Sequence, residues 1–232
     1  MSFNFLEGEI LLFDKPYLWT SFNVVGKVKF LLKKILRINK IKVGHAGTLD
    51  PMATGLIIIC TGKATKKIAE FQDKEKEYIA YIKLGSTTPS FDLETPIDKL
   101  YDYEHITYEL VENTIKDFIG DIQQIPPIYS AKQVDGKRAY KFARNGENIV
   151  LKPSLINISE IQILEFELPI LKIKVKCSKG TYIRSLARDI GEKLNSGAHL
   201  IELQRVAIGE FNVEKSLKIE EFENILKNIQ QN

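Results

Sequence analysis

The sequence predicts an α+β protein with a central mixed, largely antiparallel sheet flanked by helices. Helical and strand patterns follow one another irregularly, which does not fit the regular alternation of a βαβ-wound domain. The clearest strand is at residues 172–177, where lysines alternate with apolar residues, so one face is predicted to be core and the other wet and basic. The clearest helix is at residues 21–35, where apolar residues recur every three or four positions.

The other elements follow in chain order from similar patterns. Ser21 is the predicted N-cap of the first long helix and Thr181 that of a later one, while Gly120 is the predicted stop of a third. Asp135-Gly136 predicts a hairpin turn. The predicted strands lie at residues 10–13, 56–60, 76–85, 172–177 and 203–211, and the predicted helices lie at 21–35, up to 71, at 107–119, 183–194 and 219–229.

Size and composition narrow the class of protein. A chain of 232 residues can bury a substantial core, and we expect one catalytic-size domain over 1–232, with residues 212–232 as a C-terminal extension. The net charge is +3, which permits a nucleic-acid partner without requiring one. Cys60 and Cys177 lie in apolar runs and read as buried thiols, and the three histidines lack metal-ligand spacing. No signal peptide or bilayer-length apolar run is found, so we expect a cytoplasmic protein with no membrane association.

Residues 44–56 are the most informative stretch. They read Gly-His-Ala-Gly-Thr-Leu-Asp-Pro-Met-Ala-Thr-Gly-Leu, so that Asp50 is a lone acid among small residues, five positions after His45. From spacing alone, the favoured interpretation is that Asp50 caps a turn. A carboxylate can also act as a nucleophile, provided that a cation keeps it ionised, and arginine suits that task best. Arg184 is a candidate for it, although a surface arginine, like a core-packing Tyr78 or Tyr182, is the commoner case.

Residues 44–51 resemble, nearly letter for letter, the catalytic loop G-H-x-G-T-L-D-P of the TruB-type tRNA pseudouridine-55 synthases. Further blocks match that family in order from about Asp14 to Phe211. These are D-K-P with T-S at 14–21, K-E-Y at 76–78, P-P-I-Y-S-A at 126–131, G-K-R-A-Y at 136–140, C-S-K-G-T-Y-I-R at 177–184, G-A-H at 197–199 and L-Q-R at 203–205. The resemblance implies the pseudouridine synthase fold and isomerisation of uridine-55 in the T-loop of tRNA.

The sequence departs from the family pattern in three places. Leu18 stands where the opening motif has glycine, which bears on that turn. Gln133 replaces a lysine expected to contact RNA, and Pro89 with Ser90 replaces the aspartate and second threonine of a T-D-T-x-D run. About twenty residues follow Phe211, too few for the PUA-type RNA-binding domain that many members carry, so we expect a short form without it.

The resemblance also implies roles for single residues. Asp50 would be the nucleophile acting on a flipped uridine, Tyr78 would stack on the base, and Arg184 would hold Asp50 ionised. The implied substrate-binding residues are His45, Lys15, Tyr182, Leu203, Gly44 and Thr48. Phosphate contacts are expected from lysines such as Lys15, Lys66, Lys67 and Lys179. The implied reaction is an isomerisation that needs no cofactor or metal, and the expected partner is the T-arm of tRNA, bound by a monomer without an obligate protein partner.

Alternatives remain open at this point. Asp50 could act through attack on the sugar, through a glycal or through addition to the uracil ring. The chain could be a guide-dependent synthase that works only within a ribonucleoprotein. It could also be a non-catalytic RNA-binding or tRNA-folding module, which would use the same basic surface but would not need Asp50.

Overall fold

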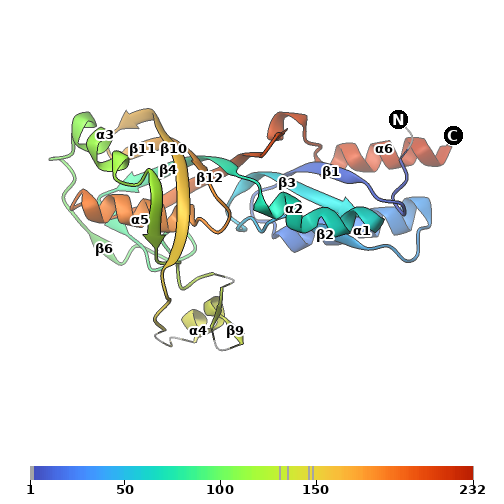
Figure 1. The fold of residues 1–232 in the computed structure, drawn as a ribbon, viewed down its shortest axis with the longest axis horizontal. Helices are drawn as coiled ribbons and strands as arrows, with labels where there is room; N and C mark the ends of the chain where they lie inside the picture. The colour runs from blue at the N-terminus through green and yellow to red at the C-terminus, as the bar shows by residue number, and fades with distance from the viewer. Residues whose placement is uncertain (1–2, 131, 135, 146, 148, 232) are drawn as a thin grey trace. The chain divides into compact units, whose positions relative to one another are not determined.

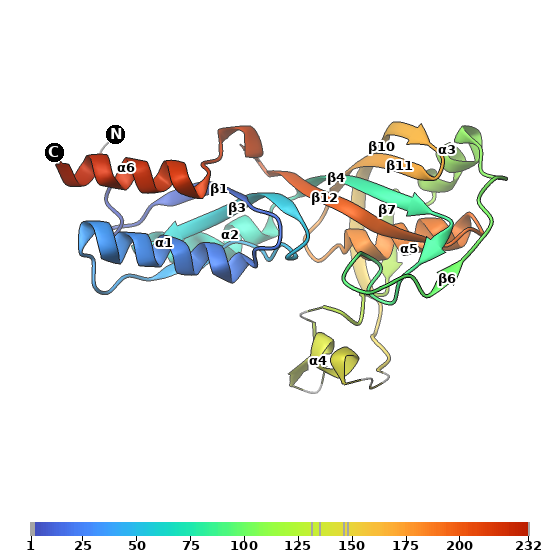
Figure 2. The ribbon, with the colours of Figure 1, turned by 180° about the vertical axis from the view of Figure 1, so that it is seen from behind.

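The computed structural model describes residues 3–130, 132–134, 136–145, 147 and 149–231 (Figures 1 and 2). Its contacts divide the chain into two compact units. Unit 1 comprises the chain up to Tyr78 together with the chain from Gln204 onward, and unit 2 comprises Ile79–Leu203. The boundaries fall inside two strands, β4 (Lys76–Leu84) and β12 (Ala198–Ile208). The prediction of one catalytic domain over 1–232 stays a prediction.

Unit 1 contains a mixed sheet. β1 (Ile10–Lys15) runs antiparallel to β3 (Thr54–Thr61). β2 (Val43–His45) also pairs antiparallel with β3, along the last residues of that strand. The end of β12 lies parallel to β3, with Arg205 opposite Gly55, and β13 (Phe211–Asn212) folds back antiparallel on β12. The predicted strands at 10–13 and 56–60 are therefore confirmed, each a little longer than its apolar run.

The two faces of this sheet are covered by different helices. Alternate residues of β3 point to opposite faces. Ile57 and Ile59 pack with α1 (Ser21–Leu36) and α6 (Ile219–Gln231), which contact each other and lie side by side in both ribbon views. Ile58 and Cys60 pack on the opposite face with η1 (Gly62–Lys67) and α2 (Ile68–Asp73). Burial raises the pKa of Cys60 to about 11, so this thiol is inert.

The N-cap of α1 is Thr20, so the prediction of Ser21 was wrong by one residue. The Thr20 side chain accepts from the backbone N–H of Asn23, and the Asn23 side chain accepts from the backbone N–H of Thr20, which makes a reciprocal capping box. Ser21 is buried instead, and its hydroxyl bonds to residue Leu49. Two adjacent hydroxyl residues can both cap on sequence grounds, and only the backbone geometry decides between them.

In unit 2, β10 (Ser154–Glu167) pairs antiparallel with β11 (Ile170–Cys177) on one side and with β7 (Gly120–Gln124) on the other, and β4 is the next strand beyond β11. The alternation predicted for β11 is confirmed, because Ile173, Val175 and Cys177 are buried and the lysines between them are partly exposed. Strand β10 was not predicted from the sequence, because its two register shifts break the apolar alternation of this long strand.

Helices α3 (Tyr108–Lys116) and α5 (Ile183–Lys193) belong to unit 2. The α5 stripe predicted from sequence is buried, but the residue at its N-cap is Tyr182, while the hydroxyl of Thr181 donates to the carbonyl of Ser178. α3 ends at Lys116, and Gly120 is the first residue of β7 instead of the helix stop. Both errors place a terminus a few residues away, as is common when a cap is read from residue type alone.

The smaller elements are short hairpins and turns. Strand β5 (Ser86–Thr87) pairs with β6 (Lys99–Leu100), and β8 (Gln133–Val134) pairs with β9 (Lys137–Arg138), just before α4 (Ala139–Arg144). The hairpin predicted at Asp135-Gly136 is confirmed by the β8–β9 pairing, although Asp135 itself, like Ala131 of the P-P-I-Y-S-A block, lies outside the described residues. η2 (Val213–Lys215) precedes α6.

The predicted fold class is confirmed: the sheet is mixed, mostly antiparallel and flanked by helices. Within the part of the chain that the structure describes, no helix combines the length and the apolar character that a bilayer crossing needs.

Candidate active site

The loop that carries Asp50 joins β2 to β3 in unit 1. Its entry is tied to the sheet by the N–H of Ala46, which donates to the carbonyl of Ile58 at 2.9 Å. Gly47 has φ +99°, a conformation that favours glycine. The carbonyl of half-buried Asp50 accepts from the N–H of Ala53 at 3.1 Å, which closes a turn at the Asp50-Pro51 step. We call residues 44–53 the Asp50 loop.

Arg205, on β12, clamps this loop from below. Its side chain is fully buried, and its guanidinium donates to three backbone carbonyls: Leu56 at 2.7 Å, Thr48 at 3.3 Å and Gly47 at 3.3 Å. The guanidinium presents its donors in a rigid planar fork, which fixes the direction of each bond, whereas a lysine ammonium is a compact charge on a flexible stem. Arg205 was not among the predicted site residues, although it belongs to the L-Q-R block.

The strand crossing beside this arginine depends on Gly55. This residue has φ +101°, and a Cβ added to it would lie 2.3 Å from the carbonyl oxygen of Arg205. The N–H of Gly55 donates to the carboxylate of Asp14 at 3.1 Å, which gives the aspartate of the opening D-K-P block a structural role. Gly55 therefore lets β12 approach closely enough for Arg205 to enter the loop.

Ser21 links the Asp50 loop to α1. Its hydroxyl accepts from the N–H of Leu49 at 2.9 Å and donates to the carbonyl of the same residue at 3.2 Å. Both backbone groups of the residue before Asp50 are thus satisfied by one buried side chain. This contact explains why the T-S pair of the opening block lies far from the loop in sequence yet belongs to the same site.

Lys15 lies beneath the loop and is fully buried (0% exposed). Its ammonium donates to the carbonyls of Trp19 at 2.6 Å, Pro16 at 3.0 Å and Pro51 at 3.2 Å. Burial lowers the pKa of Lys15 to about 8, against the attraction of nearby Asp50, which raises it. The expectation that Lys15 contacts an RNA phosphate is corrected, because its ammonium group is enclosed by carbonyls and fixes the turn that follows Asp50.

His45 stands at the start of the loop and is partly buried. Its ring meets Phe22 edge-to-face, with centroids 5.4 Å apart and an interplanar angle of 88°. Its buried Nδ1 has no hydrogen-bond partner among the described residues. Burial is the main cause that lowers the pKa of His45 below 6.5, so the ring is neutral at pH 7.

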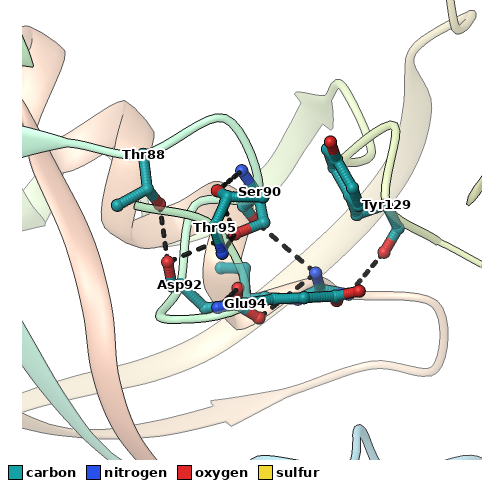
Figure 3. A network of polar contacts seen from close by, with 7 residues as sticks. Thr88, Ser90, Asp92, Glu94, Thr95 and Tyr129 are labelled. Atoms are coloured by element: carbon teal, nitrogen blue, oxygen red, sulfur yellow. Dashed lines mark hydrogen bonds and ion pairs between the residues drawn. The ribbon is translucent and has the colours of Figure 1, made fainter. Parts of the chain in front are cut away.

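Arg184, on α5 of unit 2, is almost fully buried in a polar network. Its guanidinium lies 3.3 Å from the carboxylate of Asp92 and donates to the carbonyls of Ser90 at 3.3 Å and Tyr129 at 3.0 Å. Figure 3 shows that Ser90 and Asp92 lie on one loop and Tyr129 on another segment. Asp92 was not among the predicted site residues, although it is the closing aspartate of the T-D-T-x-D run.

Hydrogen bonds from hydroxyl groups hold the loop that carries Asp92. The hydroxyls of Thr88 and Ser90 donate to the Asp92 carbonyl, at 2.6 Å and 3.2 Å, and the hydroxyl oxygens of Ser90 and Thr95 are 2.9 Å apart (Figure 3). Ser90 therefore supplies the hydroxyl of the threonine that it replaces in the family pattern.

The other two departures from the family pattern have these surroundings. Leu18 has φ +65°, the left-handed conformation that glycine adopts easily, and its N–H donates to the carbonyl of Pro51 at 2.8 Å. The backbone at Leu18 therefore has the conformation that the glycine of the family pattern suits. Lys132, next to exposed Gln133, donates to the carbonyl of Lys152 at 3.1 Å and to the hydroxyl of Ser154 at 2.7 Å.

The remaining predicted site residues have these places. In unit 1, Tyr78 is buried on β4, Thr48 is exposed on the loop, and a Cβ at Gly44 would lie 2.7 Å from Cδ1 of Ile68. In unit 2, Leu203 is half-buried on β12, and the backbone of Tyr182 exchanges two hydrogen bonds with the side chain of Gln124, at 2.8 and 3.1 Å. The Asp50–Arg184 pair, whose members belong to different units, stays a prediction.

Comparison with known proteins identifies the family. Residues 33–183 match the family described as "TruB family pseudouridylate synthase (N terminal domain)", and residues 184–232 match the "tRNA pseudouridylate synthase B C-terminal domain". The second match begins well before the extension expected at 212–232.

Curated relatives carry one shared name. The chain is 58% identical over 224 residues to the "tRNA pseudouridine synthase B" of Parabacteroides distasonis, covering 97% of this chain and 95% of that protein. It is 61% identical over 219 residues to the protein of that name from Phocaeicola vulgatus, covering 94% and 93%.

Solved structures share the fold. A chain of "Crystal Structure of a Cbf5-Nop10-Gar1 Complex" superimposes with a TM-score of 0.70 at 27% identity, over 95% of this chain and 54% of that one. A chain of "Structure of H/ACA RNP bound to a substrate RNA containing 2'-deoxyuridine" gives 0.68 at 26% identity, over 95% and 53%. This chain thus spans about half the length of those two.

The fold and the site together define a pseudouridine synthase. The chain belongs to the TruB family of these enzymes, which confirms the family and enzyme class predicted from the sequence.

Proposed function

We propose that this chain isomerises uridine-55 in the T-loop of tRNA to pseudouridine, with Asp50 as the nucleophile after the base is flipped. The observation that carries the proposal is the Asp50 loop itself. Three buried side chains from separate segments, Lys15, Ser21 and Arg205, satisfy its backbone, so half-buried Asp50 is presented on a fixed support. A reactive group held in advance loses little entropy when the substrate arrives.

The choice of tRNA as substrate rests on the relatives. The predicted tRNA pseudouridine synthase activity is confirmed by the shared name "tRNA pseudouridine synthase B", carried by proteins up to 61% identical and matched over nearly their whole length. That name, together with the TruB family match, supports position 55.

The reaction breaks one bond to the sugar and forms another. A base cannot meet a half-buried carboxylate while stacked in RNA, so the uridine must first leave its stack. The N1–C1′ bond then breaks and its electron pair goes to uracil N1, while the Asp50 carboxylate either bonds to C1′ or takes the C2′ proton to leave a glycal. The uracil then turns, and its C5 bonds to C1′. In the first route this releases Asp50, and in the second Asp50 returns its proton to C2′. Finally C5 loses its hydrogen as a proton, and N1 gains a proton.

The other predicted residues keep their roles as part of this proposal. Tyr78 stacks on the target base and Arg184 keeps Asp50 ionised, while Tyr182 and Leu203 line the site. His45, neutral at pH 7 and flanked by Gly44 and Thr48, fills space among the T-loop bases. A neutral imidazole suits that task, because it can lie against bases without a desolvated charge.

Binding is expected to depend on exposed lysines and on RNA shape. Lys66, Lys67 and Lys179 are exposed and can reach phosphates, so affinity should fall as salt rises. A folded arm with splayed bases is recognised mainly through its shape and its unstacked bases. We further propose that the chain acts in the cytoplasm as a monomer, without an obligate protein partner.

The test is pseudouridine formation at position 55 of an unmodified tRNA transcript. Wild type, Asp50→Asn and the matched surface variant Glu7→Gln are compared, since Glu7 only pairs with Lys63 at the surface. Product from wild type and Glu7→Gln, with none from Asp50→Asn, supports the proposal. A folded wild type that binds tRNA but forms no product would favour the binding module.

The guide-dependent alternative is tested in the same reaction. The titles of the two solved complexes name assemblies, an H/ACA RNP and a Cbf5-Nop10-Gar1 complex, and concern those proteins. Turnover of bare tRNA by the isolated chain excludes a requirement for a guide. Turnover that appears only after RNA or protein from the host is added would support that requirement.

A further inference from the structure

Phe22 is a large aromatic side chain that is exposed to solvent beside the Asp50 loop. It lies in the first turn of α1 and is 76% exposed. The ring of His45 covers only part of its surface, with the two ring centroids 5.4 Å apart. Tyr17 and Leu18 are also exposed, and Leu18 is hydrogen-bonded to Pro51 of the loop. We call Tyr17, Leu18 and Phe22 the apolar rim.

The core does not account for this rim. The buried face of α1 is formed by other residues of the helix, among them Val24, Val28 and Leu31. The left-handed backbone of Leu18 directs the chain through a tight turn at some conformational cost, and its side chain is still 65% exposed. A cluster of exposed apolar side chains at the edge of a reactive loop marks a contact surface.

The charge around the rim indicates which kind of partner it meets. The exposed side of α1 carries Lys27, Lys29, Lys33 and Lys34, and its first turn has no acidic residue. An aromatic ring beside a basic helix face suits single-stranded nucleic acid, since phosphates are drawn to the lysines and bases stack on the ring. Neutral His45 adds a second flat ring at the same place.

We propose that Phe22 stacks on an unpaired base of the substrate RNA other than the target uridine, and so helps to hold the RNA in place while that uridine enters the site. This inference rests on the proposed function. It assigns Phe22 a positioning role in substrate binding, next to His45 and distinct from the reacting groups.

Phe30 provides a matched control on the same helix. It is also an exposed phenylalanine (52%), two turns further along α1, but its ring is covered by the ammonium groups of Lys27 and Lys34, 5.7 and 5.6 Å from its centroid. Removing either ring should leave the fold intact, because neither belongs to the buried core.

The experiment measures tRNA affinity and turnover for wild type, Phe22→Ala, Phe22→Trp and Phe30→Ala. Loss of one stacked base weakens affinity roughly 5- to 150-fold. We expect such a loss for Phe22→Ala with an unchanged salt dependence, near wild-type affinity for Phe22→Trp, and less than about a twofold change for Phe30→Ala. Thermal melting of each variant confirms that it is folded.

A second measurement identifies the base. A set of tRNA transcripts is prepared, each with a single abasic site at a different T-loop position other than the target. For wild type, one abasic site should weaken binding, and Phe22→Ala should lose its sensitivity to that same site, since the two removals delete one shared contact. A purely structural role for Phe22 would not couple to a particular base.

The outcomes separate this inference from the proposed function. Wild-type turnover with equal affinities for Phe22→Ala and Phe30→Ala, or no coupling at any T-loop position, overturns the role of Phe22 alone. Absence of wild-type turnover overturns the proposed function. Coupling to one base with normal wild-type turnover supports both.

Discussion

Replacing Arg205 tests whether catalysis depends on the clamp that its guanidinium forms on the Asp50 loop. Arg205→Met removes three donors from the carbonyls of Leu56, Thr48 and Gly47, at 2.7, 3.3 and 3.3 Å, while keeping an unbranched apolar stem. Hydrogen bonds from a charged donor each contribute about 1.5–3 kcal/mol when well formed, and less when long. Counting the short bond at about 2 and the long ones at about 1 each, the loss is about 4 kcal/mol.

This loss is large beside the roughly 5–15 kcal/mol by which domains are stable. Arg205→Lys keeps the positive charge but not the planar fork, so it should lose about half as much. Because Asp50 lies two residues after Thr48, we also expect kcat to fall about 100-fold in Arg205→Met, the effect of a misplacement of about 1 Å. KM should change little, since Arg205 is buried and does not reach the surface.

Two assays measure these effects. Denaturant unfolding gives the change in stability, and hydrogen release from C5 of uridine in tRNA gives kcat and KM, since forming the C1′–C5 bond expels that hydrogen. If Arg205→Met keeps its unfolding free energy within about 1 kcal/mol of wild type and its kcat within about threefold, the clamp does not position the loop and the reasoning is refuted.

Three further predictions concern Asp92, Leu18 and Lys15. Asp92→Asn leaves buried Arg184 without its carboxylate at 3.3 Å, so it should lower the free energy of unfolding by about 3 kcal/mol in chemical denaturation and also lower kcat. The control Glu165→Gln, at an exposed glutamate paired with Lys172, should lower it by under about 0.5 kcal/mol. Equal effects of the two variants would contradict this prediction. Leu18→Gly should stabilise the fold by about 0.5 kcal/mol in thermal melting, because glycine relieves the positive φ of an exposed residue, and a clear drop in Tm would argue against strain there. The pKa of Lys15 falls from 10.5 in the unfolded chain to about 8 in the folded one, so between these pH values the unfolded chain holds the extra proton. The contribution of Lys15 to the free energy of unfolding therefore rises with pH across this range, by up to about 3 kcal/mol. The difference in unfolding free energy between wild type and Lys15→Met should show that rise, and a flat difference would count against it.

Much of the fold followed from local pattern. The alternation in β11, the apolar spacing in α1 and α5, and the apolar run in β3 each predicted the right element, because burial of one face sets a period of 2 or 3.6 in the sequence. Strand β10 was missed, since its two register shifts break that period. The caps at Thr20 and Tyr182 were each assigned to a neighbouring residue, because cap preference alone does not specify backbone angles.

The family could be predicted from the sequence, and the loop that carries Asp50 could be singled out, since residues 44–56 are contiguous and their order carries the signal. The fold alone shows what holds that loop: Ser21, Lys15 and Arg205 come from distant segments, and no local pattern relates Arg205 to the carbonyl of Gly47. It also turned Lys15 from an expected phosphate contact into a buried structural cation, and it gave Arg184 a partner in Asp92. The physical reason is that hydrogen bonds between buried groups depend on where strands cross, which is set by the packing of the whole sheet and not by the neighbours of each residue in the chain.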